Sequence, residues 1–350
     1  MLKAEYCRYN LIFKQPAVTS RAVMHDKLTY FIRVFDDCHP ERFGLGECAI
    51  FEGLSCDDVP DYEARLAEVC REIAAVKPCQ LADYPSIRFG VETALSDLAN
   101  GGVCMPFPSA WTDGREKIPI NGLVWMGTAE EMSRRVDDKI AAGFRCIKLK
   151  IGGVRFEDEL AIIRRIRSEH PSAELEIRLD ANGAFTPANA LERLQALGQF
   201  SIHSLEQPIK AGQWEAMADI CRKSPIPIAL DEELIGLNNQ DLRREMIHTV
   251  RPQYIILKPA LIGGLQAAQE WIDLADEYNA GWWTTSALES NVGLNAIAQW
   301  VASRGFDMPQ GLGTGALYVN NILSPVRQIG DGLIYDPDGN WDLSALTWNR

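Results

Sequence analysis

Charged side chains stand at the ends of consecutive strand-like segments in the second half of the chain. These apolar segments end in turn with Lys150, Asp180, Glu206, Asp231 and Lys258. The gaps between them are 30, 26, 25 and 27 residues, which suits one strand and one helical crossover each. Alone, an Asp at a strand end would be interpreted as a helix cap or a turn residue, and Lys258 before Pro259 as a solvated edge residue. Because the carboxyl ends of parallel strands meet at one mouth of a barrel, we predict that all five side chains reach one small volume.

Carboxylates next to lysines indicate metal-assisted proton abstraction. Three carboxylates from adjacent strands form an oxygen site suited to Mg²⁺, with Mn²⁺ as a substitute, whereas zinc would favour His or Cys, and neither is found at these positions. Side chains alternate along a strand, so Lys148 and Lys150 share one face. Two ammonium groups so close lower each other's proton affinity, and burial lowers it further, which favours a base usable near neutral pH. The pattern predicts removal of a proton α to a carboxylate, with the metal stabilising the enediolate.

Strands and helices alternate from about residue 116 onward, and these elements would position the charged groups. Eight parallel strands joined by helical crossovers close naturally into a barrel, which we predict over residues 116–324. An open doubly wound sheet is the alternative, although no glycine-rich first turn supports it. The strand-like segments are residues 118–124, 144–152, 175–183, 201–208, 226–233, 254–261, 281–287 and 309–315.

The first hundred residues have a different pattern. Residues 28–37 carry the β-branched and aromatic side chains of a strand, and nearby turn residues predict a small antiparallel sheet. Residues 59–76 and 86–101 place apolar side chains three and four residues apart, as amphipathic helices do. We therefore predict an α+β domain over residues 1–110, to which residues 325–350 return.

Composition excludes several classes of protein. The chain of 350 residues has a net charge of −13, which disfavours partners with phosphate backbones and anionic membrane surfaces. Its 9 cysteines form no C-x-x-C pair, so neither a disulfide framework nor a thiolate zinc site is expected. No apolar stretch is long enough to span a bilayer, and Glu5 and Arg8 interrupt the start where an export signal would need an apolar run. We expect a cytoplasmic protein.

Five short motifs in order resemble the enolase superfamily, in its muconate-lactonizing-enzyme-like branch. This resemblance implies an α/β fold, a (β/α)7β TIM-like barrel with an N-terminal α+β capping domain. Within the branch, residues 44–55, 177–185, 204–209 and 284–299 resemble the o-succinylbenzoate synthases of menaquinone biosynthesis. The implied activity is that of a Mg²⁺-dependent hydro-lyase that dehydrates 2-succinyl-6-hydroxy-2,4-cyclohexadiene-1-carboxylate. The five motifs are K-L-K at 148–150, L-D-A-N-G at 179–183, E-Q-P at 206–208, D-E-E at 231–233 and L-K-P at 257–259.

The resemblance also assigns roles to the strand-end residues. It implies that Asp180, Glu206 and Asp231 hold Mg²⁺. The lysines would share the remaining chemistry. Lys150 would remove the α-proton and return a proton to the departing hydroxide, while the cationic Lys258 would stabilise the enediolate and the forming ring. Lys148 would contact the substrate carboxylate, and the sequence leaves open which of the other two lysines is the kinetic base.

Five further residues are candidates for contact with a small dicarboxylate substrate. Arg178 shares the inward face of its strand with Asp180, so it either supports the lysines or binds a carboxylate in the site, or it forms an ion pair with an acidic ligand in the barrel core. Ser286 either donates a hydrogen bond to the succinyl end or caps the following helix, whose start we expect Glu289 to serve. The complete set of these candidates is Arg178, Asn182, Ser286, Ser20 and Leu54.

The eighth strand-like segment distinguishes the enzymes of this branch by the residues that they carry there. Dipeptide epimerases carry Asp-x-Asp there and muconate cycloisomerases carry an acidic residue, whereas this chain has Gly311-Leu312-Gly313-Thr314. An added carboxylate would repel a dianionic substrate, so the absence of an acid favours dehydration. Racemisation of N-acylamino acids uses the same lysines and metal and stays an alternative. Two others are a class I aldolase-like Schiff base on Lys258 and a scaffold without catalysis. Oligomeric state is left open.

Overall fold

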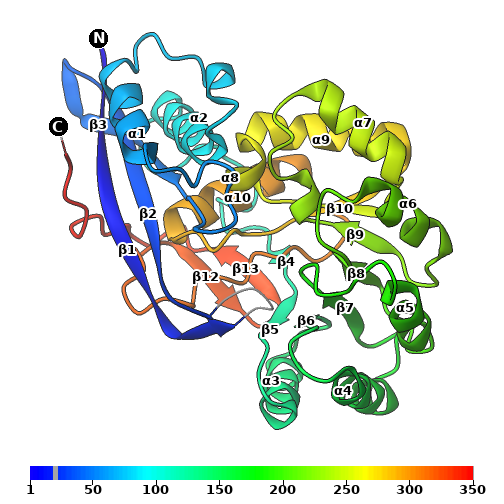
Figure 1. Cartoon of the computed structure of the whole chain (residues 1–350). Coiled ribbons are helices and arrows are strands. Elements are labelled where there is room, and N and C mark those ends of the chain that lie inside the picture. The colour runs from blue at the N-terminus through cyan, green and yellow to red at the C-terminus, as the bar shows by residue number, and fades with distance from the viewer. Residues whose placement is uncertain (19–22, 350) are drawn as a thin grey trace.

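The computed structural model describes residues 1–18 and 23–349, so the candidate Ser20 lies outside the described residues. The N-terminal part forms the predicted antiparallel sheet and helices (Figure 1). The sheet has the order β1-β2-β3. The elements of this part are β1 (Leu2–Val18), β2 (Val23–Asp36), β3 (His39–Cys48), α1 (Tyr62–Arg71), a 3-10 turn (Pro78–Leu81) and α2 (Pro85–Ala99).

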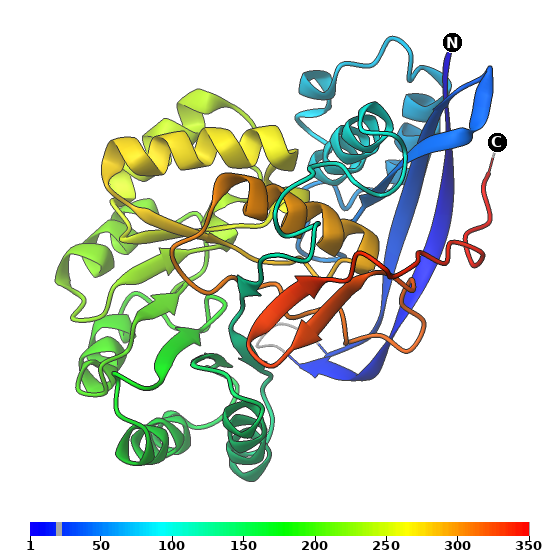
Figure 2. The same cartoon turned by 180° about the vertical axis from the view of Figure 1, so that it is seen from behind.

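Both faces of the β1-β2-β3 sheet are covered, because alternate residues of β2 face in opposite directions. Tyr30, Ile32 and Val34 pack on one face against apolar side chains of α1 and α2. Phe31 points to the other face and joins a cluster that includes side chains between residues 341 and 348. The backbone N–H of Asn349 also donates to the carbonyl of Tyr6 on β1, at 2.8 Å. The C-terminal segment thus lies along the N-terminal sheet (Figure 2).

Two glycines let α2 lie close against β3. A Cβ atom on Gly46 would lie 2.0 Å from the carbonyl oxygen of Gly90, which is far too close for two non-bonded atoms. A residue with a side chain at position 46 would therefore clash with the α2 backbone. This close approach fixes the position of Glu47, the next residue on β3, which faces the second domain.

The second domain contains a parallel sheet of seven strands, in the order β11-β10-β9-β8-β7-β6-β5. Residues 310 and 311 bridge its two edges: Gln310 pairs with Ile120, and Gly311 pairs with Thr285. The sheet therefore curls into the predicted barrel, whose eighth strand is reduced to these bridges. The strands are β5 (Gly122–Val124), β6 (Cys146–Lys150), β7 (Glu176–Asp180), β8 (Ser204–Glu206), β9 (Ile228–Leu230), β10 (Tyr254–Leu257) and β11 (Gly281–Thr284).

Helices between the strands cover the outside of the barrel (Figure 1). Their starts carry the expected signals: Thr128 and Glu131 form a capping box at α3, and Ser290 accepts a hydrogen bond from Val292 N–H at α10. The helices are α3 (Ala129–Ala141), α4 (Phe156–Glu169), α5 (Ala190–Gly198), α6 (Trp214–Lys223), a 3-10 turn (Glu232–Leu234), α7 (Gln240–Val250), α8 (Pro259–Ile262), α9 (Gly264–Tyr278) and α10 (Asn291–Arg304). None of the helices in the described ranges is both long and apolar enough to cross a membrane.

One predicted strand is divided in two. Residues 118–124 form β4 (Ile118–Pro119), which pairs with β13 (Gly332–Tyr335), and β5, which belongs to the barrel. Pro119 has no N–H to donate to a neighbouring strand, which fits the change of partner at this point. The small sheet is completed by β12 (Val326–Ile329), and its strands β12 and β13 are red in Figure 2.

Candidate active site

The strand register places the charged residues in one row. Lys150 on β6 lies beside Asp180 on β7, which lies beside Glu206 on β8. Asp231 and Lys258 directly follow β9 and β10, so they extend this row around the barrel. All five side chains are buried, and the carboxylates are at most 1% exposed. The spacing found in the sequence therefore brings these groups to one mouth of the barrel.

The lysine ammonium groups lie among the carboxylates. Lys148 Nζ is 2.9 Å from Asp180 Oδ2 and 2.5 Å from Glu206 Oε2. Lys150 Nζ is 2.5 Å from the same Asp180 oxygen. Lys258 Nζ donates to Asp231 Oδ2. Each carboxylate of the row thus contacts at least one lysine.

Asn182 holds the Lys150 side chain from the loop after β7. Its Oδ1 accepts from Lys150 Nζ at 2.9 Å, and its Nδ2 donates to Glu232 Oε1 at 2.9 Å. The backbone of Asn182 has φ of 44°, a left-handed conformation that Asn tolerates better than most residues. The L-D-A-N-G segment therefore supplies both a carboxylate and the residue that orients the neighbouring lysine.

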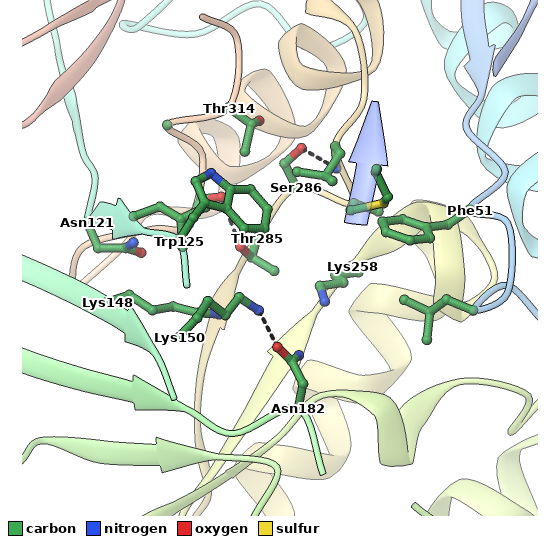
Figure 3. Close-up of a pocket in the computed structure, with 17 residues that line it drawn as sticks. Phe51, Asn121, Trp125, Lys148, Lys150, Asn182, Lys258, Thr285, Ser286 and Thr314 are labelled. Carbon is green, nitrogen blue, oxygen red and sulfur yellow. Dashed lines mark hydrogen bonds between the residues drawn. The ribbon is translucent and has the colours of Figure 1, made fainter. Parts of the chain in front are cut away.

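The lysines line a pocket of about 650 Å³, opening included, between the barrel and the N-terminal domain. Figure 3 shows Lys148 and Lys150 reaching it from one side and Lys258 from another, with Phe51 entering from the N-terminal domain. Six predicted residues line this pocket: Leu54, Lys148, Lys150, Asn182, Lys258 and Ser286. The carboxylates are almost fully buried among these lysines.

Sequence reasoning did not find several other lining residues. Asn121 and Thr314 belong to the first and last barrel segments, whose short pairing hides where a strand ends. Trp125 directly follows β5, and its place just after an apolar run is a signal that could have identified it. Phe51 lies in the same 44–55 segment as Leu54.

Burial and ion pairing set the protonation of these groups. Burial acts to lower the pKa of Lys148, but Asp180, Glu206 and Asp231 raise that pKa overall. The expectation that neighbouring lysines lose proton affinity therefore does not hold for Lys148, because the carboxylates outweigh burial and ammonium repulsion. Lys258 behaves in the same way: burial opposes its charge, and Asp231 is the largest influence that raises its pKa.

Glu206 is the carboxylate whose charge is least compensated. Burial raises its pKa well above the ordinary range, and the negative charge of Asp180 raises it further. Its Oε1 atom is buried and has no hydrogen-bond partner among the described residues. Asp180 shows the opposite shift: burial opposes its charge, but Lys148 and Lys150 hold its pKa well below the ordinary value.

These residues fit a small divalent cation. A second positive charge would offset the repulsion between Asp180 and Glu206, and the partnerless Glu206 oxygen would gain a partner. In the described ranges the three carboxylates do not each place an oxygen within 4.8 Å of the other two, and lysine ammonium groups lie among them. Hard oxygen donors without His or Cys favour Mg²⁺ or Mn²⁺ over zinc.

Arg178 does not line the pocket. Its Nε donates to Glu176 Oε1 at 2.7 Å, and its Nη1 donates to the carbonyl of Pro309 at 2.8 Å. Its guanidinium also lies 4.4 Å from the ring centroid of Trp283. The side chain thus turns toward the start of its strand, away from the carboxyl end. Of the roles predicted for it, those in the site are not supported, and the ion pair forms with Glu176 instead of with a carboxylate of the row.

Arg178→Met is therefore expected to affect stability and not substrate binding. Glu176 would lose its ion-pair partner, and we expect the free energy of unfolding to fall by about 3 kcal/mol. Denaturant unfolding and steady-state kinetics of the same variant measure both effects. A large rise in KM with unchanged stability would contradict this placement and return Arg178 to the substrate site.

Ser286 begins the turn before α10. Its Oγ accepts from the backbone N–H of Leu288 at 3.0 Å and contacts Glu289 Oε2. The helix itself is capped by Ser290, so neither Ser286 nor Glu289 caps it by its side chain, contrary to one of the two predictions for Ser286 and to that for Glu289. Ser286 instead reaches the pocket wall near Lys258 (Figure 3).

Comparison with known proteins gives a consistent family. The family model described as enolase C-terminal domain-like matches residues 131–340. The o-succinylbenzoate synthase of Desulfotalea psychrophila is 45% identical over 92% of this chain and 96% of its own length. A crystal structure of MenC from the same organism has a TM-score of 0.84 at 42% identity, covering 95% of this chain and 99% of that one.

More distant relatives catalyse other reactions. The N-succinylamino acid racemase of Thermus thermophilus is 28% identical over 73% of this chain and 67% of its own length. The L-Ala-D/L-Glu epimerase of Bacillus subtilis has a TM-score of 0.80 at 19% identity, covering 97% of both chains. The second likeness concerns the fold alone.

Proposed function

Because this chain belongs to the enolase superfamily, we propose that it is an o-succinylbenzoate synthase. The reaction is the loss of water from 2-succinyl-6-hydroxy-2,4-cyclohexadiene-1-carboxylate, which gives 2-succinylbenzoate and makes the enzyme a carbon–oxygen lyase of menaquinone biosynthesis. A small dicarboxylate is then its partner, and the nine free cysteines are consistent with a reducing, cytoplasmic location.

The observation that carries this proposal is a pair of lysines that reach one pocket from different sides. Lys150 ends β6 and Lys258 follows β10, with three strands of the barrel between them. A cyclohexadiene ring placed between them has one lysine within reach of its α-proton and the other near the opposite side. The absence of an acid at Gly311–Thr314 leaves that wall of the pocket neutral, which suits a dianion.

The lysines divide the proton chemistry. Lys150 Nζ takes the proton from the carbon α to the ring carboxylate, and the electron pair of that C–H bond moves into an enediolate. The C–OH bond then breaks, and the ammonium of Lys150 returns a proton to the departing hydroxide, so that water and an aromatic ring are formed. Lys258 remains cationic and stabilises the negative charge that develops. Lys148 binds the ring carboxylate.

Asp180, Glu206 and Asp231 would hold the divalent cation. Mg²⁺ bound there supplies positive charge that stabilises charge developing on the substrate carboxylate. Asn182 keeps the Lys150 side chain directed into the pocket, since its Oδ1 is fixed by the bond from Nδ2 to Glu232.

A dehydration assay tests the proposal directly. With Mg²⁺ present, the wild-type protein is expected to consume the cyclohexadiene substrate, followed by loss of diene absorbance. EDTA should abolish turnover, and added Mg²⁺ should restore it. A metal-loaded protein that does not dehydrate this substrate would refute the proposal. Turnover that resists EDTA but is stopped by borohydride would support a Schiff-base enzyme instead.

Racemisation of N-acylamino acids is the second candidate. Two lysines on different sides of the pocket would also allow proton removal on one face and return on the other. Exchange of the α-proton of N-succinylamino acids in D₂O measures this activity. Exchange faster than dehydration would make racemisation the main function. Epimerisation of dipeptides is less favoured, because no carboxylate on the eighth segment would bind the substrate ammonium group.

A further inference from the structure

Gln207 joins three loops at the mouth of the barrel. It directly follows Glu206, the last residue of β8, and is 0% exposed. Its backbone N–H donates to the Ala229 carbonyl on β9 at 2.9 Å, and its own carbonyl accepts from the N–H of Gly183, in the loop after β7, at 2.7 Å. The three neighbouring strands β7, β8 and β9 each lead to one carboxylate of the row (Figure 1). Gln207 is therefore bonded to all three segments that carry these carboxylates.

The side-chain amide of Gln207 uses its full capacity for hydrogen bonds. Its Oε1 accepts from the backbone N–H of Asp231 at 3.2 Å and from that of Glu233 at 3.3 Å. Its Nε2 donates to the Ile209 carbonyl and to Glu233 Oε2, both at 3.0 Å. An amide oxygen has two lone pairs and an amide NH₂ group has two protons, so every position is filled. A reversed amide would set its protons against the two backbone N–H groups, so these partners fix its orientation.

Glu233 is the second anchor of this bridge. It is 3% exposed, and its Oε1 accepts from the backbone N–H of Gly212 at 2.7 Å while its Oε2 accepts from Gln207. Gly212 lies in the loop after β8, whereas Glu233 lies in the 3-10 turn that follows Asp231. The two side chains thus tie together the segments that come directly after two carboxylates of the row.

The backbone of Gln207 has a conformation that glycine adopts more readily. Its φ is 41°, in the left-handed region where a residue with a long side chain is uncommon. Such a conformation persists where the surroundings over-determine it, and it is concentrated at functional sites. The side chain is the part that a glycine could not supply here. Its bonds to the segment of Asp231 therefore indicate what the residue contributes.

We propose that Gln207 is a positioning residue for the metal site, whose side chain holds the backbone of Asp231 at a set separation from Glu206. Mg²⁺ takes a near-ideal octahedral set of oxygen ligands, so a displaced carboxylate binds it more weakly. Groups that hold metal ligands in place are commonly worth about 10- to 100-fold in metal affinity. This inference rests on the proposed function, because it takes Glu206 and Asp231 as ligands.

Calorimetric titration of the full-length protein with the metal alone tests this role. Gln207→Met has a side chain of similar size but loses all four bonds, and Mg²⁺ affinity should fall by about 10-fold or more. Ca²⁺ accepts irregular geometry, so its affinity should fall less than that of Mg²⁺ in the same variant. Equal losses for the two cations would show that the geometry of the site is not what changed, and would contradict the proposal.

Gln310→Met is the matched control, because Gln310 is an equally buried amide that bonds to backbone. It is 1% exposed, and it joins the N–H of Thr284 to the carbonyl of Met308, both at 2.8 Å. Both variants should lower the Tm of the metal-free protein. Only Gln207→Met should weaken Mg²⁺ binding and so reduce the rise in Tm that Mg²⁺ produces. Wild-type Mg²⁺ affinity in Gln207→Met would leave Gln207 a role in stability alone and overturn the proposal.

Reversing the bridge gives a rescue experiment. In Gln207→Glu the second oxygen of the new side chain faces two acceptors, the Ile209 carbonyl and Glu233 Oε2, so Mg²⁺ affinity should fall. In the double variant Gln207→Glu/Glu233→Gln, the amide at position 233 can donate to the carboxylate at position 207. The double variant should bind Mg²⁺ more tightly than either single variant. Losses that add would show that the two side chains act independently, and would contradict the bridge.

The behaviour of the wild-type protein separates this inference from the proposed function. Wild-type protein that binds no Mg²⁺ would overturn both the metal site and the role of Gln207. Wild-type protein that binds Mg²⁺ but does not dehydrate the diene would refute the synthase activity alone, since the titrations of Gln207→Met and Gln310→Met need no substrate.

Discussion

Lys150→Ala is expected to reduce kcat for dehydration by about 10³-fold or more, because the variant has no group to remove the α-proton or to protonate the leaving hydroxide. The Lys150 ammonium touches Asp180 and Asn182 in the structure and borders the pocket. Single-turnover kinetics at saturating Mg²⁺ would separate this loss from an effect on binding or product release.

The matched control is Lys223→Ala, which removes an exposed lysine paired with Asp219 on α6. Its kcat and its melting temperature should equal those of wild type. A loss of less than tenfold for Lys150→Ala, with a large loss for a Lys258 variant, would exchange the roles of the two lysines. A large fall in the Tm of Lys150→Ala together with the fall in kcat would instead show that the residue is needed for stability.

Glu206→Gln is expected to abolish tight Mg²⁺ binding while leaving the metal-free protein as stable as wild type. Burial and the charge of Asp180 raise the pKa of Glu206 well above its usual range, which favours the protonated form of this side chain before metal binds. Glutamine resembles that neutral form. It cannot become the anionic ligand, and we expect Mg²⁺ affinity to fall at least about 100-fold, with loss of turnover.

The sign of the proton linkage follows from the raised pKa. Wild-type Glu206 must release its proton when the cation binds, so Mg²⁺ affinity should rise with pH until the folded-state pKa is passed. Calorimetry in buffers of different ionisation enthalpy should detect proton release when Mg²⁺ binds the wild-type protein, and none in Glu206→Gln. Undiminished Mg²⁺ binding by this variant would remove Glu206 from the metal site.

The barrel was predictable because its pattern is local and repeated. Each unit consists of an apolar strand, a charged residue at its end and an amphipathic helix. Because parallel strands of a barrel all end at the same face, the charged residues meet at one mouth. The register from Lys150 through Asp180 to Glu206 follows from that rule. The segments that depart from the pattern were predicted less well. The run at 118–124 divides between two sheets, and 309–315 contributes only bridges within the described structure.

Side-chain direction and charge depended on residues far away in the sequence. Arg178 shares a face with Asp180, yet its length lets it turn toward Glu176 and Pro309, where Trp283 covers it. Alternation along a strand gives the face on which a side chain lies but not the direction in which a long one extends. The raised pKa of Lys148 likewise required knowing that carboxylates of two other strands lie within a few ångströms.

The sequence by itself thus determined the class of chemistry, since residue types at fixed strand ends need only the regular geometry of the barrel to meet. The tertiary structure decided which groups are charged and which domain supports them. Glu47 binds the start of α10 across a separation of 243 residues, and that contact brings Glu47 and Glu289 into one buried site beside Ser286. Desolvation and repulsion between charges act through space, so they became visible only when the two domains were seen packed together.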